Sequence, residues 1–200
     1  MANRYAETNL PENYELLRTI DLTKNKKENN IVTILSLVLL VVAFLFGFLL
    51  RAPESVQTGN MGLVMVAALF AFAAYIVLHE VVHGAFMWYF SKVKPHFGFS
   101  LQYAYAGSDV YFHRTPYLII ALAPFVVWGV IFGVVALMFD NVWFWLFWFL
   151  FAGNASGAAG DLYVFYVVSR MQRDVLIQDD GMSMRIYAPI NQTAADPSIA

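Results

Sequence analysis

The residues best suited to chemistry lie at positions 79–83, where the chain reads His-Glu-Val-Val-His inside a long apolar run. Residues four apart share one face of a helix, so His79 and His83 can both reach one metal ion. Glu80 is placed to act on a water molecule at that metal rather than to bind the metal itself. Zinc lowers the pKa of such a water to about 7, and a nearby carboxylate can accept its remaining proton during attack on a carbonyl. The pattern therefore predicts a catalytic zinc site in which Glu80 is the catalytic base.

The alternative reading of these three residues is that they are buried polar groups that tie helices together. Inside a bilayer that reading is weak, because one ionisable side chain near the centre of a span costs at least about 2.5–3.5 kcal/mol. Three such residues within five positions need a compensating partner, and a divalent cation supplies one. The sequence favours a metal site.

A catalytic zinc site uses three protein ligands and keeps one position open. The chain has no cysteine, so the third ligand must be a histidine, an aspartate or a glutamate. Asp161 is the other ionisable residue inside an apolar run, and it lies about as far along its run as His79 does. We therefore expect His79, His83 and Asp161 to be the metal ligands. His96 and His113, which lie in the connection between two runs, are the competing candidates.

The composition is that of a membrane protein. Hydrophobic residues make up 60% of the chain and charged residues 13%, whereas soluble domains are about 45–50% apolar. The mean hydropathy is +0.60. The absence of cysteine excludes disulfides, thiolate metal sites and cysteine nucleophiles, and the net charge of −2 gives no indication of a nucleic-acid partner.

Four apolar runs are long enough to cross a hydrocarbon core, which takes about 20 helical residues. They are Ile31–Leu50, Met61–Phe90, Pro116–Phe139 and Val142–Ser169. The sequence thus predicts an all-α membrane protein with four transmembrane helices. Its membrane domain occupies residues 31–169, between an N-terminal segment at 1–30 and a tail at 170–200.

The lysines and arginines predict the orientation. They are concentrated in the N-terminal segment, in the connection between the second and third spans, and in the tail, and Arg51 stands almost alone on the other side. Because basic residues favour the cytoplasmic side, both termini and residues 91–115 are expected there. The expected location is the cell membrane, with several spans and both termini in the cytoplasm.

The connection between the second and third spans predicts a short β-hairpin on the cytoplasmic side. Apolar residues alternate from Phe97 to Tyr105, residues 106–109 (AGSD) are a turn signal, and VYFH at 110–113 can return as a second strand. In the tail, MSMRIYAPI at 182–190 is a further possible strand. The N-terminal segment is expected to be amphipathic and to lie against the membrane.

The fourth span carries a stripe of small and polar residues, namely Asn154, Gly157, Ala158 and Asp161. Small residues let helices approach closely or leave room for a substrate. Asn154 can serve in one of two ways: it can donate a hydrogen bond to a substrate carbonyl or an oxyanion, or it can form an interhelical hydrogen bond.

This combination of motifs resembles the site-2 protease group of intramembrane zinc proteases. It is closer still to a family of small bacterial membrane proteins suspected to be zincin peptidases, through HEVVHG at 79–84, a proline-bearing third span and GDLY at 160–163. The likeness covers about residues 10–180. In site-2 proteases the aspartate belongs to an Asn-x-x-Pro-Asp-Gly pattern, whereas here Asn154 stands seven residues ahead of Asp161, Leu162 follows it and the proline is missing. The resemblance therefore extends to the third ligand and not to the details of substrate handling.

The resemblance implies that His79, His83 and Asp161 bind Zn²⁺ and that Glu80 is the general base and later the proton donor. It implies a transmembrane or membrane-associated peptide substrate, cleaved near the cytoplasmic face of the bilayer. A peptide of this kind can add as an extra strand to the edge formed by Leu101, Gln102 and Tyr103.

Two other classes of function are compatible with the same residues. One is a zinc-binding membrane scaffold that does not catalyse, but a structural site has no need of the carboxylate of Glu80 beside the metal. The other is a small transporter, but a transport route places polar residues along the full membrane depth, and here they gather at one level. The sequence therefore favours a metallopeptidase.

Overall fold

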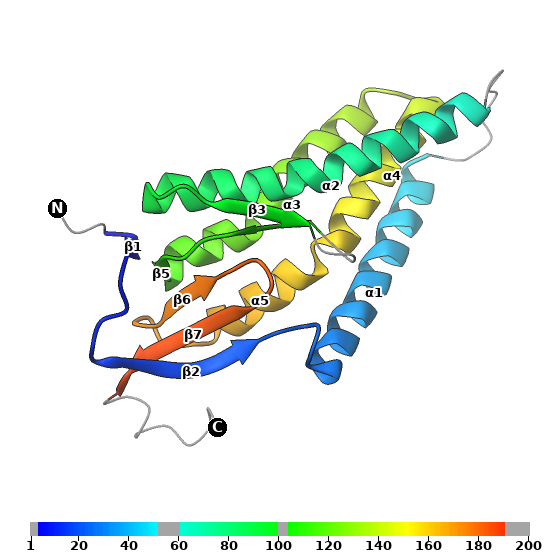
Figure 1. Cartoon of the computed structure of the whole chain (residues 1–200). Coiled ribbons are helices and arrows are strands. Elements are labelled where there is room, and N and C mark those ends of the chain that lie inside the picture. The colour runs from blue at the N-terminus through cyan, green and yellow to red at the C-terminus, as the bar shows by residue number, and fades with distance from the viewer. Residues whose placement is uncertain (1–3, 52–60, 100–103, 191–200) are drawn as a thin grey trace.

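The computed structural model describes residues 4–51, 61–99 and 104–190 of the chain (Figure 1). In these ranges the helices are α1 (Lys26–Leu50), α2 (Met61–Ser91), α3 (Arg114–Leu137), α4 (Val142–Gly157) and α5 (Ala159–Ser169). The strands are β1 (Ala6–Glu7), β2 (Tyr14–Ile20), β3 (His96–Phe99), β4 (Ala104–Gly107), β5 (Tyr111–His113), β6 (Leu176–Asp179) and β7 (Met184–Pro189).

Three of these helices, α1, α2 and α3, are long and apolar enough to cross a membrane, in agreement with the first three predicted spans. The fourth predicted span is not one straight helix. It consists of α4 and α5, which meet at an angle of 41° and pass the same test only as a bent pair. The described residues thus hold three or four candidate spans, which is compatible with a multi-pass membrane protein.

The bend between α4 and α5 occurs at Gly157 and Ala158. Glycine is a poor helix former, and Ala158 has a ψ of 6°, which interrupts the helical path. The chain resumes as α5 at Ala159, so Asp161 lies in the first turn of a new helix.

A five-stranded antiparallel sheet lies at one end of the helices, in the order β1-β5-β6-β7-β2 (Figure 1). Its strands come from the N-terminal segment, the connection between α2 and α3, and the tail, and the strand expected in the tail is confirmed as β7. The prediction of an all-α protein with one short hairpin is therefore wrong about the amount of sheet. The N-terminal segment also contributes strand β2.

The predicted hairpin exists, but its turn lies elsewhere. β3 pairs with β4 in a separate two-stranded sheet in which Phe97 faces Ala106, so residues 106 and 107 belong to a strand and the hairpin turn predicted at 106–109 is wrong. The expected return strand is β5, which pairs with β6 instead. Leu101, Gln102 and Tyr103 lie outside the described residues.

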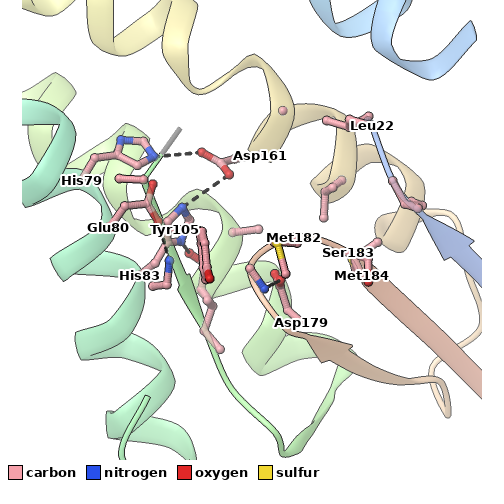
Figure 2. Close-up of a pocket in the computed structure, with 18 of the residues that line it drawn as sticks. Leu22, His79, Glu80, His83, Tyr105, Asp161, Asp179, Met182, Ser183 and Met184 are labelled. Atoms are coloured by element: carbon pink, nitrogen blue, oxygen red, sulfur yellow. Dashed lines mark hydrogen bonds and ion pairs between the residues drawn. The ribbon is translucent and has the colours of Figure 1, made fainter. Parts of the chain in front are cut away.

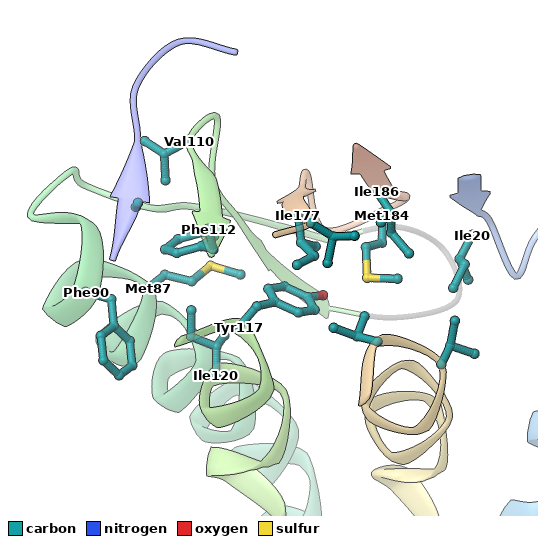
Figure 3. Packing of buried hydrophobic residues seen from close by; sticks show 14 of the residues in the cluster. Ile20, Met87, Phe90, Val110, Phe112, Tyr117, Ile120, Ile177, Met184 and Ile186 are labelled. Carbon is teal, nitrogen blue, oxygen red and sulfur yellow. The ribbon is translucent and has the colours of Figure 1, made fainter. Parts of the chain in front are cut away.

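The five-stranded sheet is attached to the helices by a common apolar core (Figure 3). One face of the strands packs against the ends of α2, α3 and α5, and the buried side chains include Ile20, Met87, Phe90, Val110, Phe112, Tyr117, Ile120, Ile177, Met184 and Ile186. Burial of each large apolar side chain contributes about 1.5–3 kcal/mol relative to exposure. The sheet and the helix ends therefore form one body around the site described next.

Two arginines fasten the elements next to this core. Arg18 on β2 forms an ion pair with the buried Glu28 in the first turn of α1, at 2.5 Å. Arg114, the first residue of α3, donates hydrogen bonds to the carbonyl oxygens of Val168 and Ser169 at the end of α5. Cationic side chains are favourable at that position because a helix C-terminus carries partial negative charge.

Candidate metal centre

The side chains of His79, His83 and Asp161 meet between α2 and α5 (Figure 2). His79 and His83 project from one face of α2, as the i, i+4 spacing predicts. His79 Nε2 lies 3.1 Å from one carboxylate oxygen of Asp161, and His83 Nε2 lies 3.4 Å from the other. One ligand atom from each residue falls within 4.8 Å of the other two.

These distances suit a zinc ion. Tetrahedral zinc with bonds of about 2.0–2.1 Å holds neighbouring ligand atoms about 3.3 Å apart. Each histidine nitrogen lies at about this distance from an oxygen of Asp161, although the two histidines face different oxygens. Two imidazoles and a carboxylate also form a common catalytic zinc set. The three side chains therefore form a ligand set of the type and spacing that can hold a zinc ion.

The competing histidines lie elsewhere. His96 Nε2 is 3.3 Å from the carbonyl oxygen of Asp180, and His113 Nε2 is 3.5 Å from the carboxylate of Glu7. Among the residues that the structure describes, the group that could hold a metal comprises His79, His83 and Asp161 and neither of these two.

Each metal-facing histidine has a partner for its other ring nitrogen. His83 Nδ1 lies 3.0 Å from the carbonyl oxygen of Ile120, which can only accept a hydrogen bond. His83 must therefore carry its proton on Nδ1, which leaves the Nε2 lone pair for a metal.

The other histidine is oriented through two further side chains. The Asn154 amide donates to the carbonyl oxygen of Phe125 (3.0 Å), and the Asn154 amide oxygen accepts from the Tyr75 hydroxyl (3.1 Å). Because that hydroxyl has used its proton, it accepts from His79 Nδ1 at 3.0 Å. This chain of hydrogen bonds again leaves the Nε2 lone pair of His79 for a metal.

Asn154 itself does not line the pocket at the metal group. Its side chain is fully buried and joins α4 to α2 and α3. Of the two roles considered from the sequence, the structure contains the interhelical hydrogen bond.

Glu80 lies beside the two histidines and faces the same pocket. One of its carboxylate oxygens accepts a hydrogen bond of 2.9 Å from the backbone N–H of Ala106 on β4. The hairpin can approach α2 here because Gly84 has no side chain: a Cβ atom at this position would lie 2.3 Å from the ring of Phe97. Strand β4 therefore orients the candidate base, a contact that the sequence did not predict.

The metal group opens into a pocket of about 510 Å³. His79, Glu80 and Asp161 lie at one end, and Leu22 and Met184 lie at the other (Figure 2). The pocket is walled by α2, α3, α5 and β4, and also by the β2–α1 and β6–β7 connections.

Asp179, at the end of β6, is a pocket residue that sequence reasoning missed. Its carboxylate accepts hydrogen bonds from the Tyr117 hydroxyl (2.5 Å) and the Gly181 N–H (2.9 Å). Burial raises the pKa of Asp179 above its usual value, although these hydrogen bonds act in the opposite direction. The signal available in the sequence was Asp179-Asp180-Gly181, a turn motif next to the predicted tail strand.

Comparison with known proteins assigns the chain to a family. The profile of a family described as "Putative zincin peptidase" matches residues 72–176, which include the three residues of the metal group and Glu80. The chain belongs to this family. Membership indicates a metallopeptidase, and the word zincin implies zinc as the metal.

One curated relative gives a further likeness. The chain is 30% identical over 114 residues to an "Uncharacterized 24.7 kDa protein in gap 5'region" of Pyrococcus woesei. The match covers 56% of this chain and 51% of the relative, so the chain spans about half the length of the relative that it matches. No solved structure matches the chain.

Proposed function

We propose that the protein is a zinc-dependent, membrane-embedded peptidase that cleaves transmembrane or membrane-associated peptides near the cytoplasmic face. The observation that carries this proposal is the convergence of His79, His83 and Asp161 on one point, with Glu80 beside them. In a zincin family, this is the arrangement expected of a hydrolytic site.

The residues divide the chemistry among them. Zinc, when bound by His79, His83 and Asp161, would polarise a peptide carbonyl and lower the pKa of a water molecule. Glu80 accepts the proton of the attacking water and then delivers it to the nitrogen of the leaving amine. The Ala106 N–H holds the Glu80 carboxylate in place between the two transfers.

The depth of the site supports cleavage near a membrane surface. Asn29, in the first turn of α1, lines the same pocket as the metal group. It follows Lys26 and Lys27, which lie where α1 begins and which favour the aqueous boundary of a span. The pocket therefore lies at the basic, sheet-bearing ends of the helices, which we place on the cytoplasmic side.

The proposal is tested by metal content and peptide cleavage in the same preparations of detergent-purified protein. We expect about one zinc per chain in the wild type and much less in Asp161→Ala. Glu80→Gln should keep its zinc and lose cleavage of membrane-associated peptides, because the substitution removes the catalytic base but leaves the three metal ligands in place. Glu15→Gln, at an exposed position on β2, is the matched control and should behave as the wild type.

Other outcomes would contradict the proposal in different ways. Zinc retained by Asp161→Ala would mean that the third ligand lies elsewhere. Zinc present in the wild type without cleavage of any peptide tested would favour a zinc-binding scaffold. Cleavage unaffected by Glu80→Gln would show that Glu80 is not the base.

A further inference from the structure

The pocket at the metal group has two walls of different origin. The wall that carries the metal group is made of α2, α3, β4 and α5, and its residues lie within positions 72–176, the part matched by the zincin family. The opposite wall comes from residues 20–29 and 179–184, which lie outside the matched part. The two ends of the chain thus complete a site whose chemistry is carried by the middle.

Of the four polar side chains on this second wall, those of Thr23, Asp179 and Ser183 are held in hydrogen bonds, and that of Asn29 is the fourth. The Thr23 hydroxyl donates to Asp21 at 2.6 Å, and the Ser183 hydroxyl donates to Asp180 at 3.0 Å. Asp179 accepts from Tyr117 and from the backbone of Gly181. Between these polar groups, the wall presents hydrocarbon and thioether surface to the pocket, from Ile20, Leu22, Met182 and Met184.

This apolar surface is continuous with the buried core and reaches α5, the helix that carries Asp161. Ile20 and Met184 are paired across β2 and β7 and are both buried in the core (Figure 3). Leu22 reaches α5: a Cβ atom at Gly160 would lie 3.8 Å from Leu22 Cδ1. Gly160 immediately precedes Asp161 in the chain, so Leu22 packs against the turn of α5 that carries a candidate metal ligand.

We propose that this wall is a substrate-recognition subsite that binds a large apolar side chain, such as leucine, methionine or phenylalanine, close to the bond that is cleaved. The inference rests on the proposed function and names the substrate class. An apolar side chain gains free energy when it leaves water for such a surface. An aspartate loses its hydration there with little compensation, because three of the wall's four polar side chains are already hydrogen-bonded.

Binding measurements on Glu80→Gln protein in lipid nanodiscs test the subsite, because peptides are then held without being cleaved. The probes are three soluble peptides that are identical except for a central leucine, alanine or aspartate. We expect the leucine peptide to bind at least about tenfold more tightly than the aspartate peptide, with the alanine peptide between them. Adding the substitutions Leu22→Ser and Met182→Ser should reduce this preference to less than about threefold.

A matched pair of substitutions controls for partition of apolar peptides into lipid. Leu16→Ser with Ile190→Ser removes two exposed apolar side chains that do not line the pocket, and should leave the preference unchanged. Equal affinity for the three peptides, or an equal loss of preference in both double variants, would overturn the subsite.

Cleavage of the same peptides by protein with Glu80 intact separates the two proposals. Leucine-selective binding that depends on Leu22 and Met182, without any cleavage, would support the subsite and contradict the peptidase function. Cleavage of the leucine and aspartate peptides with the same kcat/KM would support the peptidase and overturn the subsite.

Discussion

At the scale of single residues, the site depends on groups that do not face the metal position. His79 and His83 each need a fixed tautomer, and each obtains it from a different source: a helix carbonyl for His83, and the Tyr75–Asn154 pair for His79. Partners of this kind fix the ring orientation and raise the basicity of the ligand. Asn154 lies on α4, three residues before the bend and seven before Asp161. It is therefore a residue that positions His79 rather than a metal ligand.

Removing this support should weaken metal binding. We expect Tyr75→Phe and Asn154→Ala each to lower zinc affinity by about 10–100-fold, because the imidazole of His79 loses its fixed orientation. Competition with a zinc-binding dye measures the affinity. Tyr75→Phe and Asn154→Ala should together cost little more than either alone, since they interrupt one chain of hydrogen bonds.

Ser156→Ala is the matched control on the same helix. Ser156 also forms an interhelical hydrogen bond, of 2.8 Å to Ser36, but it has no contact with His79 in the structure. Its zinc affinity should equal that of the wild type. An equal loss in Ser156→Ala and Asn154→Ala would mean that general helix packing, rather than the orientation of His79, controls metal binding.

At the scale of elements, strand β4 connects the base to a strand edge that faces the pocket. The Ala106 N–H points to Glu80 and therefore away from β3. Backbone groups two residues apart in a strand point to the same side, so those of Ala104 also face the pocket. A peptide could pair with this edge beside Glu80, as expected for strand addition.

Proline at the edge should separate this contact from metal binding. Ala104→Pro removes an N–H that points away from β3, so we expect loss of peptide cleavage with zinc content unchanged. Ala104→Gly keeps the N–H and should retain most of the cleavage. Gln102→Pro should act as Ala104→Pro does if the edge extends into residues 100–103. Normal cleavage by Ala104→Pro would contradict strand addition.

The β6–β7 turn carries two neighbouring carboxyls with opposite pKa shifts. Burial raises the pKa of Asp179 above 3.8. Burial acts in the same direction on Asp180, but hydrogen bonds from Ser183 and Met182 outweigh it and lower the pKa of Asp180 below 3.8. A carboxyl whose pKa is raised in the folded state stabilises the protein at acid pH, and this stabilisation is lost as the pH rises through the folded-state pKa. A carboxyl whose pKa is lowered stabilises the protein at higher pH, and this stabilisation is lost as the pH falls through the folded-state pKa.

These signs predict different pH profiles for two matched variants. The difference in melting temperature between Asp179→Asn and the wild type should shift in favour of the variant as pH rises from acid toward neutral. For Asp180→Asn, the same difference should shift in favour of the variant as pH falls toward the acid range. Thermal unfolding in detergent measures both, and parallel profiles for the two variants would contradict the opposite shifts.

At the scale of the whole molecule, the chain is strongly asymmetric along its helices. The sheet, the start of α1 and the end of α2 lie at one end, and the end of α1, the start of α2 and the end of α3 lie at the other (Figure 1). Every lysine and arginine except Arg51 belongs to the sheet-bearing end. With 31 residues, α2 is about 46 Å long, well beyond a hydrocarbon core of about 30 Å. Part of α2 can therefore carry the site toward the surface.

The absence of cysteine makes this orientation directly testable. Asp140→Cys places a thiol between α3 and α4, and Glu15→Cys places one on β2 at the opposite end. A membrane-impermeant maleimide should label Asp140→Cys in intact cells and Glu15→Cys only after lysis. The reverse pattern would invert the orientation, and labelling of both in intact cells would contradict a membrane-spanning arrangement.

The sequence by itself determined the features that depend on local pattern. Helical spacing places His79 and His83 on one face, three apolar runs match α1, α2 and α3, and alternation locates β7. Matching depths in two spans also predicted that Asp161 would meet the histidines, because a buried charge needs a partner at its own level.

Only the tertiary structure decided which distant segments pair. Strand β2 pairs with β7 across most of the chain, and β5 pairs with β6 across α3, α4 and α5, and no local pattern specifies such partners. The same holds for the Ala106 contact with Glu80 and for the apolar wall that the two ends of the chain build opposite the metal group. Periodicity shows which face of an element is buried, whereas the identity of the covering element depends on how all the apolar faces are buried together.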